Sequence, residues 1–146
     1  KNTKSMKEIH SYWAYIVLMV LSYAVANAII GFVKKKEFTN KDLRIGLFAL
    51  IVCHIQLLIG LAWYFMSPWF DVLTRNASAV LKEKSVRLLA VEHPVIMILA
   101  IAVITIGWSK HKKKNVAKEK FKTFAIFYGI GLLLILSKIP WGTWFS

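Results

Sequence analysis

Residues 12–33 read YWAYIVLMVLSYAVANAIIGFV, an apolar stretch that contains no Asp, Glu, Lys or Arg. An α-helix rises about 1.5 Å per residue, so a stretch of this length can cross a hydrocarbon core of roughly 30 Å. Apolar helices of soluble domains are usually shorter than this or interrupted by charge. The stretch therefore predicts a helix that spans a membrane.

Three further stretches share this character, at about 45–66, 88–108 and 121–139. We therefore expect an all-α integral membrane protein, a four-helix bundle that forms a single domain over residues 1–146. The chain is 58% hydrophobic and 18% charged, whereas soluble domains are about 45–50% apolar and about 25% charged. A nucleic-acid-binding protein can carry a net charge of +13, but not apolar runs over most of its length, so we expect no nucleic-acid partner.

Lysine and arginine are concentrated in two connections, residues 34–44 and 110–122. Basic loops stay in the cytoplasm, so this distribution predicts both connections on the cytoplasmic side and both termini outside it. The predicted location is the bacterial inner (cytoplasmic) membrane, with anionic headgroups as partners of the charge. The tryptophans fall near span ends, as expected for interfacial anchors: Trp13, Trp63, Trp69, Trp108, Trp141 and Trp144.

The start of the chain also has some features of a secretory signal, with Lys1, Lys4 and Lys7 before the apolar stretch. That stretch continues well past the cleavage-like Ala26-Asn27-Ala28, so we expect the first span to be retained. Because Lys1 is not an initiator methionine, we expect residues upstream of it.

Few costly residues occur within the spans, and such residues indicate function by default. They are His10, His54, Gln56, Glu92, His93 and Lys138. No metalloprotease, nucleotide-binding or serine-hydrolase motif is present, and the single cysteine, Cys53, excludes a disulfide framework. Neutral imidazole is the commonest metal ligand, and histidines on different helices of a bundle are how membrane cytochromes hold haem b.

Counting residues from the span ends places His10 and His93 near the outer ends of spans one and three, with His54 deeper. We therefore expect His10 and His93 to be the axial ligands of a haem b. Arg87 and Lys84 are close enough in sequence to meet its propionates. Met97 follows His93 by one turn, so His/Met ligation is the alternative.

Each of these histidines also has a structural interpretation. His10 can be an interfacial polar residue, and His93 can mark a helix start or kink at Pro94, which leaves a backbone carbonyl free. His54 can hydrogen-bond between helices, bind a quinone with Gln56, or bind a second cofactor. We expect His111, within SKHKKK, to be solvated, Cys53 to lie in the core and Lys138 to reach outer headgroups.

Four segments together resemble a known family: IHSYWAYIVLMVL (9–21), HIQLLIGLAWYFMSP (54–68), VEHPVIMILAIAVITIG (91–107) and FYGIGLLLILSKIPW (127–141). They are similar to small four-span bacterial membrane proteins labelled cytochrome b-like, and more distantly to half of a heme A synthase. The resemblance implies haem b and electron transfer, with ligand roles on His10 and His93 first and His54 next. It departs from two-haem cytochromes b, which need four intramembrane histidines.

The expected function is a haem b cytochrome that transfers electrons between quinol and a partner or subunit. Two imidazole ligands fill both axial sites of iron, which favours electron transfer over oxygen chemistry. The competing hypothesis is a non-redox accessory or assembly subunit of a larger inner-membrane complex, with histidines used for helix packing. A third is a small transporter or metal-handling protein that uses His54, against which stands the lack of intramembrane carboxylate pairs and discontinuous helices.

Overall fold

The computed structural model describes the backbone of residues 2–144 and the side chains of residues 4–144, and this part of the chain is entirely helical apart from its connections. The elements are α1 (Asn2–Val33), α2 (Asn40–Met66), α3 (Pro68–Arg75), α4 (Ala77–Lys82), α5 (Lys84–Arg87), the π-helical turn η1 (Leu88–Glu92), α6 (His93–Lys112), α7 (Ala117–Lys138) and α8 (Trp141–Trp144).

Four helical runs are long and apolar enough to cross a membrane: α1, α2, the continuous run from α5 through η1 to α6, and α7. The four predicted spans are thus confirmed as helices. The first begins well before residue 12, because polar residues at the ends of a span remain helical where water or headgroups solvate them. Between spans two and three the connection forms two short helices, α3 and α4.

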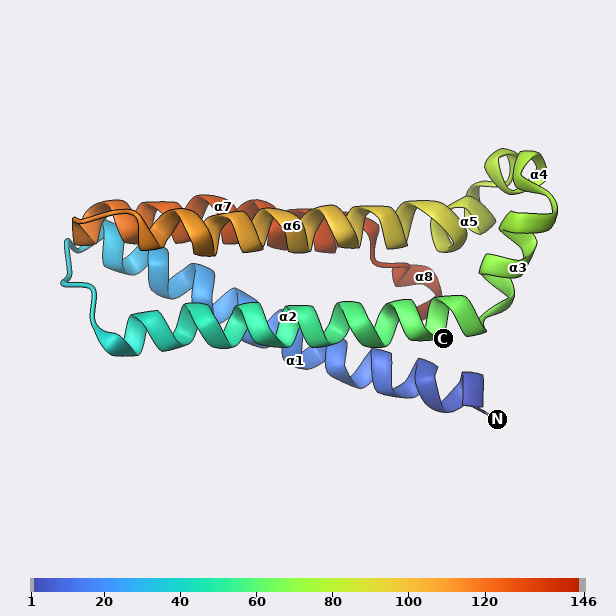
Figure 1. Cartoon of the computed structure of the whole chain (residues 1–146), viewed down its shortest axis with the longest axis horizontal. Coiled ribbons are helices and arrows are strands. Elements are labelled where there is room, and N and C mark those ends of the chain that lie inside the picture. Colours follow the sequence, from blue (N-terminus) through green and yellow to red (C-terminus); the bar gives the residue numbers. More distant parts are fainter. Residues whose placement is uncertain (1, 145–146) are drawn as a thin grey trace.

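The four long helices form a bundle in which each packs mainly on two neighbours (Figure 1). α1 lies against α2 and α7, and α6 lies against α7 and α2. The start of α1, the short helices α3 to α5 and the final helix α8 lie at one end of the bundle (Figure 1). The two lysine-rich connections lie at the opposite end, which we call the lysine-rich end.

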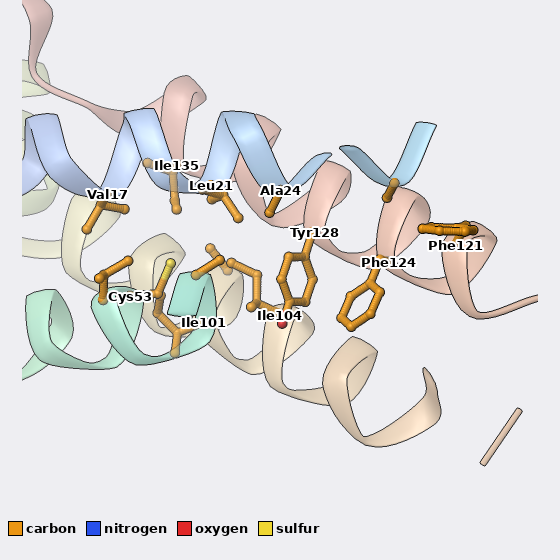
Figure 2. Close-up of a cluster of buried hydrophobic side chains, with 14 residues drawn as sticks. Val17, Leu21, Ala24, Cys53, Ile101, Ile104, Phe121, Phe124, Tyr128 and Ile135 are labelled. Atoms are coloured by element: carbon orange, nitrogen blue, oxygen red, sulfur yellow. The ribbon is translucent and has the colours of Figure 1, made fainter. Parts of the chain in front are cut away.

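The core is a continuous column of apolar side chains between these helices (Figure 2). On α1 the buried positions are Val17, Leu21, Ala24 and Ala28, which recur at helical spacing. Small residues at this face let the backbones approach closely, as is usual between membrane helices. Cys53 is fully buried in the same column, as the sequence predicts.

Several polar side chains cross between helices within this apolar surrounding. Tyr128 donates to the carbonyl of Gly46 at 2.8 Å, and the Trp13 indole donates to the carbonyl of Val52 at 2.9 Å. Asn27 donates to Asp42 at 2.9 Å. Each polar group is thereby satisfied away from water, which fixes the register of α1 and α7 against α2.

The prediction that His111 is solvated is wrong, because the structure buries this side chain completely. Its ring lies 4.3 Å from that of Phe124 and 4.6 Å from that of Trp108, between centroids. α6 continues to Lys112, and His111 follows the buried Gly107 by one helical turn on the inward face. The polarity of the surrounding lysine run conceals this single inward position.

Glycine on α7 sets the distance between α6 and α7, and a matched pair of substitutions tests this. A Cβ at Gly131 would lie 2.5 Å from Ile104 Cγ1 and 3.3 Å from the Ala100 carbonyl oxygen, whereas a Cβ at Gly129 meets nothing within 4 Å. We expect Gly131→Ala to lower the free energy of unfolding by about 1–3 kcal/mol. Gly129→Ala should leave it unchanged or raise it by up to about 1 kcal/mol.

The measurement is reversible unfolding in mixed micelles, followed by the loss of helical circular dichroism. An equal cost for both substitutions would contradict the close packing of α6 on α7 at Gly131.

Candidate functional site

A cavity of about 330 Å³ lies between the four long helices at the end of the bundle that holds α8. We call it the His10–His93 cavity. Its volume falls within the range of about 300–1,000 Å³ that is usual for small-molecule and cofactor sites. Its walls are mainly apolar, and they include residues of α3 and of the segment Pro140–Trp144 as well as the long helices.

Two of the predicted site histidines meet in this cavity. His10 comes from α1 and His93 from α6, and their ring centroids lie 6.2 Å apart with the ring planes nearly perpendicular, at 87°. Met97, one turn beyond His93, also lines the cavity. The structure therefore brings together His10, which is far from the other two in the sequence, with His93 and Met97 of α6.

The ring of His93 is oriented by the end of α7. Its Nδ1 lies 2.8 Å from the backbone carbonyl oxygen of Lys138. A carbonyl can only accept, so Nδ1 carries the proton and donates it. In the neutral ring the lone pair is then on Nε2, which is the nitrogen available to a ligand.

The ring of His10 packs on a glycine of α2. A Cβ at Gly60 would lie 2.9 Å from His10 Cε1, so a larger residue there would displace the ring. The ring of Trp63 lies 5.6 Å away on the same side. Nδ1 of His10 is buried and has no hydrogen-bond partner.

Unsatisfied polar atoms gather at this cavity. Among the side chains described, four buried nitrogen or oxygen atoms have no partner, and three of them belong to residues that line it: His10 Nδ1, Gln56 Oε1 and Trp63 Nε1. Gln56 itself is held in place, because its amide nitrogen donates to the His10 carbonyl at 2.8 Å. Buried polar atoms are rarely left unpaired, so this concentration indicates a place where a ligand belongs.

The backbone before His93 departs from regular helix because of Pro94. The turn η1 is π-helical, and the His93 amide bonds to the carbonyl of Leu88, five residues back. Pro94 has no N–H for the carbonyl of Ala90, four residues back. The hydroxyl of Tyr64 on α2 donates to that carbonyl instead. The irregular backbone at Pro94 thus takes the form of a π-helical turn, and the Tyr64 hydrogen bond ties α2 to this turn beside the cavity.

A charged cluster joins the same ends of α6 and α7. Glu92 pairs with Arg87 at 2.9 Å and with Lys138 at 3.2 Å. Arg87 also donates to the Leu81 carbonyl at 2.8 Å, and it is not among the residues that line the cavity. The ammonium group of Lys138, which the sequence predicts to reach outer headgroups, also bonds to a carboxylate within the protein.

His54 takes no part in the cavity lining. Its Nδ1 lies 2.8 Å from the Leu50 carbonyl oxygen, and its Nε2 lies 3.3 Å from Thr105 Oγ1 on α6. These are the contacts of a hydrogen bond between helices, one of the interpretations that the sequence leaves open. The structure thus separates His54 from Gln56, which does line the cavity.

Sequence reasoning missed the roles of Gly60 and Trp63. Trp63 was expected to be an interfacial anchor, but it lines the cavity with its Nε1 atom buried. Cys53, Gln56, Gly60 and Trp63 recur every three or four positions, so they share one face of α2. This periodicity could have indicated a face of α2 that lines a site. It is hard to recognise in the sequence, because the residues on the other faces of α2 are apolar as well.

The donor set limits which metals this site can hold. Within the part of the chain that the structure describes, no group of three or more His, Cys, Asp or Glu side chains is placed to bind a metal ion. Protein zinc sites need three or four such ligands. A pair of imidazoles is sufficient for a metal that brings its other ligands with it, as iron does in a porphyrin.

No protein-family profile, curated protein or solved structure matches the chain. An assignment of function therefore depends on the geometry of the His10–His93 cavity and on the residues that line it.

The repair of the kink by Tyr64 can be tested with a double-mutant cycle. Tyr64→Phe should lower the free energy of unfolding by about 1–2 kcal/mol, because the Ala90 carbonyl loses its partner. In a Pro94→Ala background the new N–H of residue 94 can bond to that carbonyl, so the cost of Tyr64→Phe should fall toward zero. Unfolding in mixed micelles measures both values.

Tyr12→Phe is the control, since Tyr12 is 68% exposed and its loss of a hydroxyl should have little effect. The same cost for Tyr64→Phe in both backgrounds would refute the link between Pro94 and Tyr64.

Proposed function

We propose that this protein is a membrane cytochrome that holds one haem b between His10 and His93 and transfers electrons between quinol and a protein partner. The observation that carries the proposal is the pair of imidazoles at one cavity and on different helices, with no third His, Cys, Asp or Glu placed beside them among the residues that the structure describes.

The two rings are close enough for His10 and His93 to hold one cofactor between α1 and α6. Their centroids are 6.2 Å apart. The unpartnered Nδ1 of His10 and the space that Gly60 leaves beside this ring fit the same interpretation.

The residues of the chain prepare the site in three ways. The Lys138 carbonyl fixes the tautomer of His93 so that Nε2 is free. Gly60 allows the His10 ring to lie against α2. The walls are mainly apolar, which lowers the polarity around a bound group, and Met97 would replace His93 in the His/Met alternative. Haem bound here would supply one-electron redox chemistry, with a potential that burial and nearby charge adjust.

The charge distribution gives the proposed orientation. The lysine-rich end would face the cytoplasm, which places both termini and the His10–His93 cavity toward the outside of a bacterial inner membrane. A quinol can reach the protein through the bilayer, and a subunit of a larger complex is a suitable second partner. This orientation puts the proposed haem near the outer membrane surface.

A reduced-minus-oxidised absorbance spectrum of the protein purified in detergent tests the proposal, with haem quantified as the pyridine haemochrome. We expect about one haem b per chain, because His10 and His93 are a single pair of ligands and would hold a single haem. His10→Ala and His93→Ala should each abolish binding. His54→Ala is the matched control and should retain haem, because His54 bonds between α2 and α6 outside the cavity.

Circular dichroism must show that each variant keeps its helices. Haem lost only with His54→Ala would refute the His10–His93 assignment. If the folded wild-type protein binds no haem at all, the non-redox accessory subunit becomes the better account, with the histidines serving helix packing.

A second test uses a residue that cannot be a ligand. Gly60→Val should displace the His10 ring and weaken haem binding by roughly tenfold. A factor of ten corresponds to a loss of about 1.4 kcal/mol in the free energy of binding. The rate of haem transfer to excess apomyoglobin measures the effect. Gly129→Val, at a position open beyond 4 Å, should transfer haem at the wild-type rate, and equal effects of the two would count against the proposed site.

A further inference from the structure

A second hollow lies between α1 and α2 and shares no lining residue with the His10–His93 cavity. We call it the α1–α2 groove. It is lined by Met19, Val20 and Tyr23 of α1 and by Lys41, Arg44, Ile45 and Phe48 of α2. The groove is open along one side, so its contents would be in contact with the surrounding bilayer.

Two cations lie at the lysine-rich end of this groove. Lys41 and Arg44 fall in the first turns of α2, which begins at Asn40. Neither forms an ion pair with a carboxylate in the part of the chain that the structure describes. Asp42, between them in sequence, is engaged elsewhere, because it accepts from the Asn27 amide and from the Thr39 backbone. Their charge is therefore available to an outside anion.

The rest of the groove is apolar and accessible. Met19 is 72% exposed, Phe48 is 55% exposed and Tyr23 is 54% exposed. On α2, Lys41, Arg44 and Phe48 recur at helical spacing, so the cations and the apolar wall belong to one face. A ligand that lies along this face would contact two positive charges at one end and apolar side chains within two helical turns of them.

We propose that the α1–α2 groove binds one anionic phospholipid, with its phosphate at Lys41 and Arg44 and an acyl chain along Met19, Tyr23 and Phe48. A basic site between membrane helices suits a lipid headgroup, and a guanidinium can bind a phosphate with two parallel hydrogen bonds. The adjoining apolar wall favours a lipid over a free phosphate ion. The absence of an ion-pair partner for either cation within residues 4–144 favours an anionic headgroup over a zwitterionic one.

Native mass spectrometry of the full chain in detergent, titrated with phosphatidylglycerol, tests the proposal. We expect one tightly retained lipid, and a loss of affinity of roughly tenfold or more in the variant Lys41→Gln/Arg44→Gln. The matched control is Lys113→Gln/Lys114→Gln, which removes the same charge from exposed positions at the same end. Its affinity should stay within about twofold of wild type.

Three results would overturn the proposal. They are an equal loss of affinity in both double variants, equal retention of phosphatidylcholine, and displacement of the lipid by millimolar inorganic phosphate. Photocrosslinking supplies a second readout that does not depend on charge: benzoylphenylalanine at position 48 should capture the retained lipid. At position 133, where the native leucine is 67% exposed on α7, capture should be no more than background, and equal capture at the two positions would also overturn it.

Discussion

The interior of a bilayer offers no hydrogen-bond partner, so the backbone of a membrane-spanning chain must satisfy its own polar groups. Four long helices meet that requirement almost everywhere. Pro94 is the exception, because it deprives the Ala90 carbonyl of its usual partner. The hydroxyl of Tyr64 replaces the missing amide, and the helix passes through a π-turn to reach His93. The irregular turn and the cavity are adjacent for a physical reason, since Pro94 disrupts the helical hydrogen bonds of the turn before it and directly follows His93.

The same requirement makes the polar atoms of the His10–His93 cavity informative. Elsewhere in the described part of the bundle, buried hydroxyls and amides find backbone carbonyls, as Tyr128 and Trp13 do. At the cavity, atoms of His10, Gln56 and Trp63 stay unpaired although each unpaired group carries a free-energy cost. Three of the four unpaired atoms among the described side chains lie at this cavity, where two imidazoles also converge, and the fourth is His111 Nε2 near the lysine-rich end. A bound cofactor would offset such a cost, which makes the cavity a better candidate site than His54.

Much of the architecture follows from local patterns that the sequence displays. Uninterrupted apolar length predicts the four spans, and counting along helices ranks His10 and His93 together at one end, where the structure also puts them. The partners of those rings do not follow in the same way. The Lys138 carbonyl and Gly60 act through contacts between residues that are tens of positions apart, and no single helix encodes them. His111 shows the converse error, since one inward position within a lysine run is set by helix phase and not by average polarity.

The segment Pro140–Trp144 follows the last span, yet it contributes to the wall of the His10–His93 cavity, and the Trp144 ring stacks on Tyr15 of α1 at 4.8 Å. The first and last of the described helices thus meet over one site. A wall made by so short a segment depends on few contacts, so its detachment from α1 would cost less free energy than the separation of two long helices. Such a detachment would open the cavity at this side and leave the rest of the bundle in place.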